Sequence, residues 1–210
     1  MSEYSLVIGS PRYSSWSLRP WLLMRHLGLD FEHTIIELYQ PDTRARILRH
    51  SPAGRVPVLK HGAATLWESL AIIEYLAERH PGLGVWPAAP EARARARALA
   101  AEMHAGFAQL RQELPMDLIG AEPRHTLSAE TQADVARIVE AWHAARVAFG
   151  AGGPFLFGGF CGTDAMFAPV VVRLLTYGVA LEAEARRYAE AVWSLPAMLA
   201  WRRLAGAPVS

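Results

Sequence analysis

The chain has 210 residues, of which 52% are hydrophobic and 20% are charged, so it can bury a sizeable core. Its formal net charge of +1 gives no reason to expect a nucleic acid or an anionic membrane as a partner, and no apolar run approaches the roughly 20 residues of a membrane span. The first residues lack the pattern of a signal peptide, and the lone Cys161 rules out an internal disulfide, so we expect a cytoplasmic protein.

The first eighty residues mix short apolar runs with helical patterns. Residues 4–9 form an apolar run that ends in glycine, which predicts a buried strand, and residues 34–38 predict a second strand. Between them, apolar residues at helical spacing stop at Gly28, which predicts a helix. Residues 42–50 predict a short basic helix.

Two further strands and a helix are predicted between residues 54 and 79. A turn at His61-Gly62 joins the two strands, and the helix starts near Glu68 and Ser69. The order is therefore βαβαββα. A helix between the first two strands implies parallel pairing, and the short turn implies an antiparallel hairpin. This α/β pattern, a mixed sheet with helices on both faces, is the thioredoxin-like arrangement, and we assign it to residues 1–80.

Serines stand in the loop before the first predicted helix. A redox protein of this arrangement would carry Cys-x-x-Cys there, whereas this chain has Ser14-Ser15-Trp16-Ser17, so dithiol exchange is excluded. Serine at a helix start is commonly a simple N-cap. Alternatively, a serine hydroxyl and the helix N-terminus hold the thiolate of a ligand, which is the nucleophilic form of a thiol.

The stretch from Val56 to Ser69 offers groups that can hold a ligand. Val56-Pro57 enters a strand, and a cis bond there would leave the Val56 backbone free to pair with an extended peptide. Glu68 and Ser69 fall at a helix start, where they and the free backbone N–H groups can bind a charged ligand end.

The composition changes after residue 80. Residues 81–90 are rich in Pro and Gly, which predicts a linker, and residues 91–149 have a strongly helical composition. We expect helices over 91–114 and from Ser128 to about Phe149, a Gly-rich loop over 150–160, a buried helix near Asp164 and two short final helices before a Pro-containing tail. Residues 91–210 are thus predicted to be all-α. The sequence shows no metal-binding spacing and no phosphate-binding loop.

These pieces together resemble the cytosolic glutathione transferase family, over essentially the whole chain. The Val56-Pro57 step, the Glu68-Ser69 pair twelve residues on and the serine-bearing loop that ends at Arg19 are similar to its N-terminal domain. The resemblance implies that Ser14 activates the thiol of glutathione, the co-substrate, with Ser15 as the second choice.

The resemblance also implies how the peptide is held. Val56 would pair its backbone with the cysteinyl unit, next to a cis Pro57, and Arg55 would lie near the glutathione backbone. Glu68 and Ser69 would hold the γ-glutamyl end. Ser14, Val56 and Ser69 should then line one groove. Three further residues were considered for the glycyl carboxylate: Gln40, Arg44 and His50.

The serine loop is closest to the zeta class, whose loop reads Ser-Ser-Cys where this chain has Ser-Ser-Trp. The resemblance implies a homodimeric enzyme that adds glutathione to a hydrophobic electrophile, with Met103, His104 and Phe107 near the electrophile pocket. An alternative is cis-trans isomerisation of the maleylacetoacetate type, which needs cationic groups, with Arg173 as the nearest candidate. A further alternative is a non-catalytic binding or regulatory protein.

Overall fold

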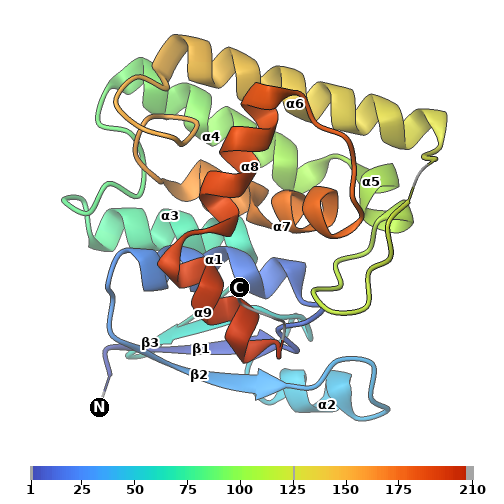
Figure 1. Cartoon of the computed structure of the whole chain (residues 1–210). Coiled ribbons are helices and arrows are strands. Elements are labelled where there is room, and N and C mark those ends of the chain that lie inside the picture. The colour runs from blue at the N-terminus through green and yellow to red at the C-terminus, as the bar shows by residue number, and fades with distance from the viewer. Residues whose placement is uncertain (1, 125, 207–210) are drawn as a thin grey trace.

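The computed structural model describes residues 2–124 and 126–206 (Figure 1). The Pro-containing tail over 207–210, the end of the predicted helical domain, lies outside the described residues. Within the described residues, no helix combines the length and the apolar character needed to cross a membrane.

The N-terminal part has the predicted βαβαββα order, and the thioredoxin-like arrangement is confirmed. Its elements are, in chain order, β1 (Tyr4–Gly9), α1 (Ser15–His26), β2 (Phe31–Ile36), α2 (Thr43–Leu48), β3 (Val58–His61), β4 (Ala64–Trp67) and α3 (Ser69–Arg79). The strands lie in the order β2-β1-β3-β4. β1 pairs parallel with β2 and antiparallel with β3, and β3 pairs antiparallel with β4. β2 lies two to three residues earlier than predicted.

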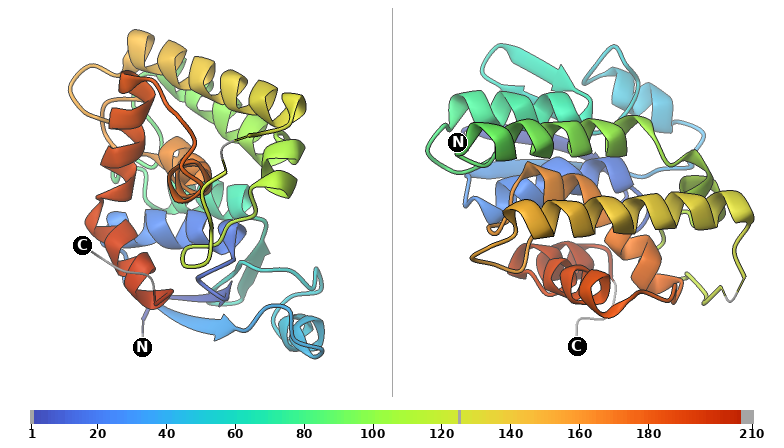
Figure 2. Two further views of the ribbon diagram at one scale, coloured as in Figure 1. Left: turned by 45° about the vertical axis from the view of Figure 1, so that its right-hand side comes forward. Right: turned by 90° about the horizontal axis from the view of Figure 1, so that it is seen from above.

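Alternation along the central strand divides the core between the two faces of the sheet. Leu6 and Ile8 of β1 point into the main core, which also contains the buried side chains of α1 and α3. Val7, between them, joins a smaller core with Val58 and with Ile47 of α2. Successive side chains of a strand point to opposite faces, so α2 lies on the face away from α1 and α3, next to β2 (Figure 2).

The rest of the described chain is mainly helical. Its helices are α4 (Pro90–Ala105), α5 (Ala108–Glu113), α6 (Ala129–Phe149), α7 (Gly162–Thr176), α8 (Ala183–Trp193) and α9 (Pro196–Leu204). The buried α7 packs against α1 on one side and α4 on the other, and it appears nearly end-on at the centre of the left view of Figure 2. α9 also contacts α1, so the two parts of the chain share one main core.

One predicted helix is divided. Residues 91–114 were expected to form a single helix, but α4 ends at Ala105 and α5 begins at Ala108. Phe107 has a φ of 62°, a left-handed conformation that cannot continue a right-handed helix. The Leu110 N–H, in the first turn of α5, is satisfied by the Asp134 carboxylate at 3.0 Å. Apolar spacing runs through this break, so periodicity alone could not reveal it.

Asp164 secures the start of α7. Its carboxylate accepts hydrogen bonds from the backbone N–H groups of Leu156 at 3.1 Å and Cys161 at 2.9 Å. The neighbouring Thr163 donates from its hydroxyl to the Ala96 carbonyl of α4 at 3.0 Å. Complete burial raises the pKa of Asp164 to about 6, although these hydrogen bonds oppose the rise.

Candidate active site

A cavity of about 480 Å³ opens at the junction of the two parts of the chain. The segment 54–57 and the segment 67–69 supply much of its wall, and Leu38 and Ile47 add apolar surface. The helical part contributes His104 from α4, and α1 contributes Trp16. Most of the lining residues thus lie just before the β3–β4 hairpin or at its end, where α3 begins.

The structure brings together the five residues assigned to the peptide. Arg55, Val56, Pro57, Glu68 and Ser69 all line this cavity. The Val56–Pro57 peptide bond is cis, as predicted. Glu68 is exposed, whereas Ser69 is buried and is the first residue of α3. Among the residues that the structure describes, no side chain caps the α3 N-terminus, so its first backbone N–H groups remain available to a ligand.

Ser14 and Ser15 of the preceding loop are not among the residues that line the cavity, so a groove shared by Ser14, Val56 and Ser69 stays a prediction. Ser14 is the N-cap of α1: its hydroxyl accepts from the Ser17 N–H at 3.4 Å and donates to Ser17 Oγ at 2.8 Å. Ser14 is only 4% exposed. The contacts of Ser14 are therefore those of a helix N-cap, the first of the two interpretations that the sequence allows. Ser15 Oγ has no hydrogen bond among the described residues.

Trp16 and His104 form a further part of the cavity wall. No pattern in the sequence indicated Trp16. Trp16 follows the two serines and was treated only as a replacement for a cysteine, whereas its ring faces the cavity. The His104 ring meets it edge-on, with the centroids 5.3 Å apart. His104 Nε2 lies 3.7 Å from a Glu68 carboxylate oxygen. Burial, followed by the nearby charge of Arg19, lowers the pKa of His104 below its usual value.

Two arginines lie against the faces of Trp16. The Arg19 guanidinium carbon is 4.2 Å from the ring centroid, and that of Arg111 is 4.8 Å away. Arg111 donates to backbone carbonyls at the end of α4, including Gly106 at 3.0 Å and also Met103. Both guanidinium groups therefore make cation–π contacts with one indole.

Arg19 has no counterion at ion-pair distance among the described residues. Its guanidinium is fully buried and donates one hydrogen bond, from Nη1 to Ser69 Oγ at 3.3 Å. Nε and Nη2 are buried without a partner among the described residues. Burial holds the pKa of Arg19 well below its usual value, and the charges of Arg111 and Arg173 add to this effect. The sequence marked Arg19 only as the end of a loop motif.

Several residues considered earlier lie elsewhere. Met103 and Phe107 are buried in the main core, so among the three α4-region candidates only His104 lines the cavity. Arg173 donates to the Pro169 carbonyl within α7 at 3.1 Å and to the Leu114 carbonyl, outside α7, at 2.9 Å. None of the three residues considered for the glycyl carboxylate lines the cavity.

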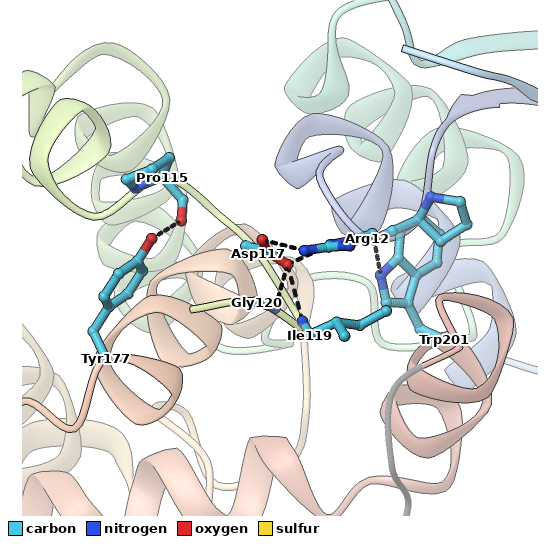
Figure 3. A network of polar contacts seen from close by, with 8 residues as sticks. Arg12, Pro115, Asp117, Ile119, Gly120, Tyr177 and Trp201 are labelled. Atoms are coloured by element: carbon cyan, nitrogen blue, oxygen red, sulfur yellow. Dashed lines mark hydrogen bonds and ion pairs between the residues drawn. The ribbon is translucent and has the colours of Figure 1, made fainter. Parts of the chain in front are cut away.

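The loop that carries the serines is held by the helical part on two sides (Figure 3). Arg12 donates from Nε and Nη2 to the two carboxylate oxygens of Asp117, at 2.6 and 2.7 Å. Trp201 of α9 donates from Nε1 to the Pro11 carbonyl at 3.1 Å. Hydrogen bonding from Arg12 lowers the pKa of Asp117 to about 2. The helical part thus helps to fix the position of the loop just before α1.

Comparison with known proteins identifies relatives of this arrangement. Residues 13–79 match the family model described as "Glutathione S-transferase, N-terminal domain". A probable maleylacetoacetate isomerase of Caenorhabditis elegans is 33% identical over 110 residues, 52% of this chain and 51% of that protein. Maleylacetoacetate isomerase of Rhizobium meliloti is 41% identical over 87 residues, 41% of each chain. The aligned region thus spans about half or less of these curated relatives.

Solved structures extend the similarity over the whole chain. A glutathione transferase homolog from Burkholderia gl BGR1, with bound glutathione, is 27% identical with a TM-score of 0.73, covering 97% of this chain and 98% of that one. A glutathione S-transferase from the Antarctic clam Laternula elliptica, 18% identical with a TM-score of 0.72 over 95% and 92%, shares the fold.

The solved structures share the fold of this chain, a thioredoxin-like domain followed by a helical part. Residues 13–79 are thus similar to the N-terminal domain of glutathione S-transferases, including two maleylacetoacetate isomerases, and the whole chain has the fold of solved glutathione transferases.

Proposed function

We propose that this protein is a glutathione transferase, which uses glutathione as co-substrate and transfers it to a hydrophobic electrophile. The observation that carries the proposal is the shared cavity of Arg55, Val56, Pro57, Glu68 and Ser69. One wall supplies a strand backbone for an extended peptide, and another supplies a carboxylate, a hydroxyl and an uncapped helix N-terminus for a charged end.

The chain would act by ionising and orienting the thiol. A free thiol has a pKa near ~8.5, and one charge-assisted hydrogen bond would lower it by about one to two units. Ser14 and Ser15 are the two proposed donors. Ser14 would have to turn its O–H away from Ser17 to serve, whereas Ser15 Oγ has no competing hydrogen bond in the described chain. Holding the thiolate against a second bound substrate then favours reaction.

The electrophile is proposed to be hydrophobic because much of the remaining wall is apolar or aromatic. Trp16, Leu38, Ile47 and Trp67 line it, and His104 adds a ring whose lowered pKa favours the neutral form. Isomerisation of the maleylacetoacetate type is the second proposed activity, and the similarity to two proteins of that name favours it. Arg55 is the one arginine or lysine among the lining residues that could face a dicarboxylate.

Two measurements test these proposals together. Retention on a glutathione-affinity column, with elution by free glutathione, is expected for the transferase and for the isomerase. A panel of electrophiles, assayed for thiol consumption beside an isomerisation assay, then separates the two activities. Absence of retention and of turnover would favour a non-catalytic binding or regulatory protein.

We also propose the division into a glutathione-binding domain (1–80), a linker (81–90) and a helical domain (91–210) that forms the electrophile pocket. In support, no helix or strand is assigned between His80 and Ala89. A homodimer and a cytoplasmic location are proposed from the family resemblance. Light scattering of the purified protein tests the dimer: the mass of a single chain would contradict it.

A further inference from the structure

Tyr39, in the loop between β2 and α2 (Figure 1), combines an exposed aromatic ring with an unfavourable backbone conformation. Its side chain is 80% exposed, the highest value among the exposed large hydrophobic residues of the described chain. Its φ is 63°, in the left-handed region that disfavours any residue with a Cβ atom, whereas glycine would fit there without strain. Strained conformations of this kind persist only where surrounding contacts impose them, and they cluster at ligand sites.

Hydrogen bonds on both sides of Tyr39 hold the loop in this shape. Ser10 of the serine loop donates from Oγ to the Glu37 carboxylate at 2.7 Å and accepts from the Leu38 N–H at 2.8 Å. After Tyr39, Thr43 donates from its hydroxyl to the Glu37 carbonyl at 2.7 Å. The loop is therefore closed on itself, and it is joined to the loop that carries the two proposed thiol donors.

The Tyr39 ring lies against a second aromatic ring, that of Tyr13. The two centroids are 5.6 Å apart and the planes meet at 74°, which is an edge-to-face pair. The Arg12 guanidinium carbon lies 4.8 Å from the Tyr13 ring centroid. Tyr13 is thus held between two partners, whereas Tyr39 contacts this one aromatic ring among the described residues and leaves most of its surface open.

This aromatic pair lies beside the proposed position of the reacting sulfur. Tyr13 directly precedes Ser14 and Ser15, the proposed donors to the thiol. Leu38, which directly precedes Tyr39, lines the cavity, whereas Tyr39 itself is not among the lining residues. A substituent on the sulfur that extends out of the cavity past Leu38 would therefore meet the Tyr39 ring.

We propose that Tyr39 is a specificity-determining residue for the second substrate: its ring stacks on an aryl group, so that the site selects aryl over alkyl electrophiles. The inference rests on the proposed function and names the substrate class of the same site. The face of a tyrosine ring carries negative charge density, so an electron-poor ring such as a nitroaryl group is the best partner. Tyr39 holds this ring and takes no part in the bond-making step.

The test compares two glutathione conjugates that differ in the group on sulfur. Isothermal titration measures the Kd of S-(4-nitrobenzyl)glutathione, of S-butylglutathione and of glutathione itself. Tyr39→Ala should reduce the preference for the nitrobenzyl over the butyl conjugate by roughly two- to tenfold, the effect of one aromatic pair. The Kd of glutathione should stay unchanged. Tyr39→Phe should keep the wild-type preference, because the ring and not the hydroxyl makes the contact.

Two further variants separate this role from a structural one. Tyr39→Gly removes the ring together with the backbone strain, so it should lose the same selectivity while a thermal melt shows equal or higher stability. Val147→Ala is the matched control, because Val147 is another exposed hydrophobic residue, 71% exposed on α6, and does not line the cavity. It should leave the ratio of the two dissociation constants unchanged.

The possible outcomes distinguish the inference from the function on which it rests. A wild-type ratio in Tyr39→Ala, equal weakening of all three ligands in that variant, or an equal change of the ratio in Val147→Ala would each overturn the inference alone. A wild-type chain that binds none of the three ligands would overturn the proposed function and this inference with it.

Discussion

At the scale of single residues, the site depends on which hydroxyl meets the thiol. Ser14 caps α1 and is engaged with Ser17, and Ser15 follows it as the first residue of the helix. We expect Ser14→Ala to lose turnover by about tenfold or more while glutathione still binds, because the variant loses a hydrogen bond to the thiolate. The pH–rate profile should move to higher pH by about one to two units.

Ser15→Ala is the matched variant for this experiment. A normal rate in Ser14→Ala, together with a loss in Ser15→Ala, would move the role to Ser15. Loss of the cap alone would lower stability by about 1 kcal/mol without shifting the pH profile, so a thermal melt distinguishes the two effects.

The structure brings together in one cavity the predicted site residues that are close in sequence. Arg55 to Pro57 lie just before the β3–β4 hairpin and the Glu68-Ser69 pair lies just after it, so their spacing already implied one cavity. Trp16 and His104 meet across 88 positions of the chain, and no local pattern reports such a contact. The orientation of Ser14 depends on a choice of rotamer, which the sequence does not encode locally.

At the scale of elements, features that act locally in the sequence could again be predicted, and features that depend on long-range contacts could not. The strand and helix order followed from apolar runs, glycine stops and one short turn, because these features act locally. The break between α4 and α5 arises from a non-glycine residue, Phe107, in a left-handed conformation, which tertiary contacts must maintain. Phenylalanine, unlike glycine or proline, does not indicate in the sequence that a helix ends.

The start of α7 gives a prediction about pH. Asp164→Asn should lower the free energy of unfolding by about 1–3 kcal/mol, because an amide has a single acceptor oxygen and its NH2 group would face one of the two backbone N–H donors, Leu156 or Cys161. Urea unfolding near neutral pH, followed by circular dichroism, measures this difference.

The raised pKa sets the direction of the pH dependence. In the folded chain Asp164 takes up a proton near pH 6, whereas in the unfolded chain it does so near its ordinary pKa of 3.8. Between these values the folded state binds more protons, so the stability of the wild-type chain relative to Asp164→Asn should rise as pH falls from about 7 to about 5, by roughly 1 kcal/mol. A difference that stays constant or shrinks would contradict the raised pKa.

At the scale of the whole molecule, the Arg12–Asp117 pair joins the serine loop to the helical part. The pKa of Asp117 is lowered to about 2, below its ordinary value of 3.8, so the pair contributes stability above pH 3.8 and loses it as pH falls toward 2. Asp117→Asn should therefore lower the urea midpoint near neutral pH, and the difference should vanish in acid. Turnover should fall as well, because the loop before α1 is less well held.

Glu190→Gln is the control for that experiment. It removes a carboxylate that also pairs with an arginine, Arg186, but the pair lies exposed within α8 and does not join the two parts. We expect no change in turnover. An equal loss of turnover in both variants would show that removing any carboxylate is sufficient, and that the loop contact has no special role.

The contacts of Figure 3 also bear on how such proteins can be recombined. The Pro11 carbonyl is held by Trp201, 190 positions away, and Arg12 by Asp117, 105 positions away. Consider a chimaera that joins this N-terminal part to the helices of another relative. It would keep those pocket residues that lie in the N-terminal part, but it would lose both contacts that hold the serine loop. Transplanting Asp117 and Trp201 together with that N-terminal part is the minimal graft that preserves them.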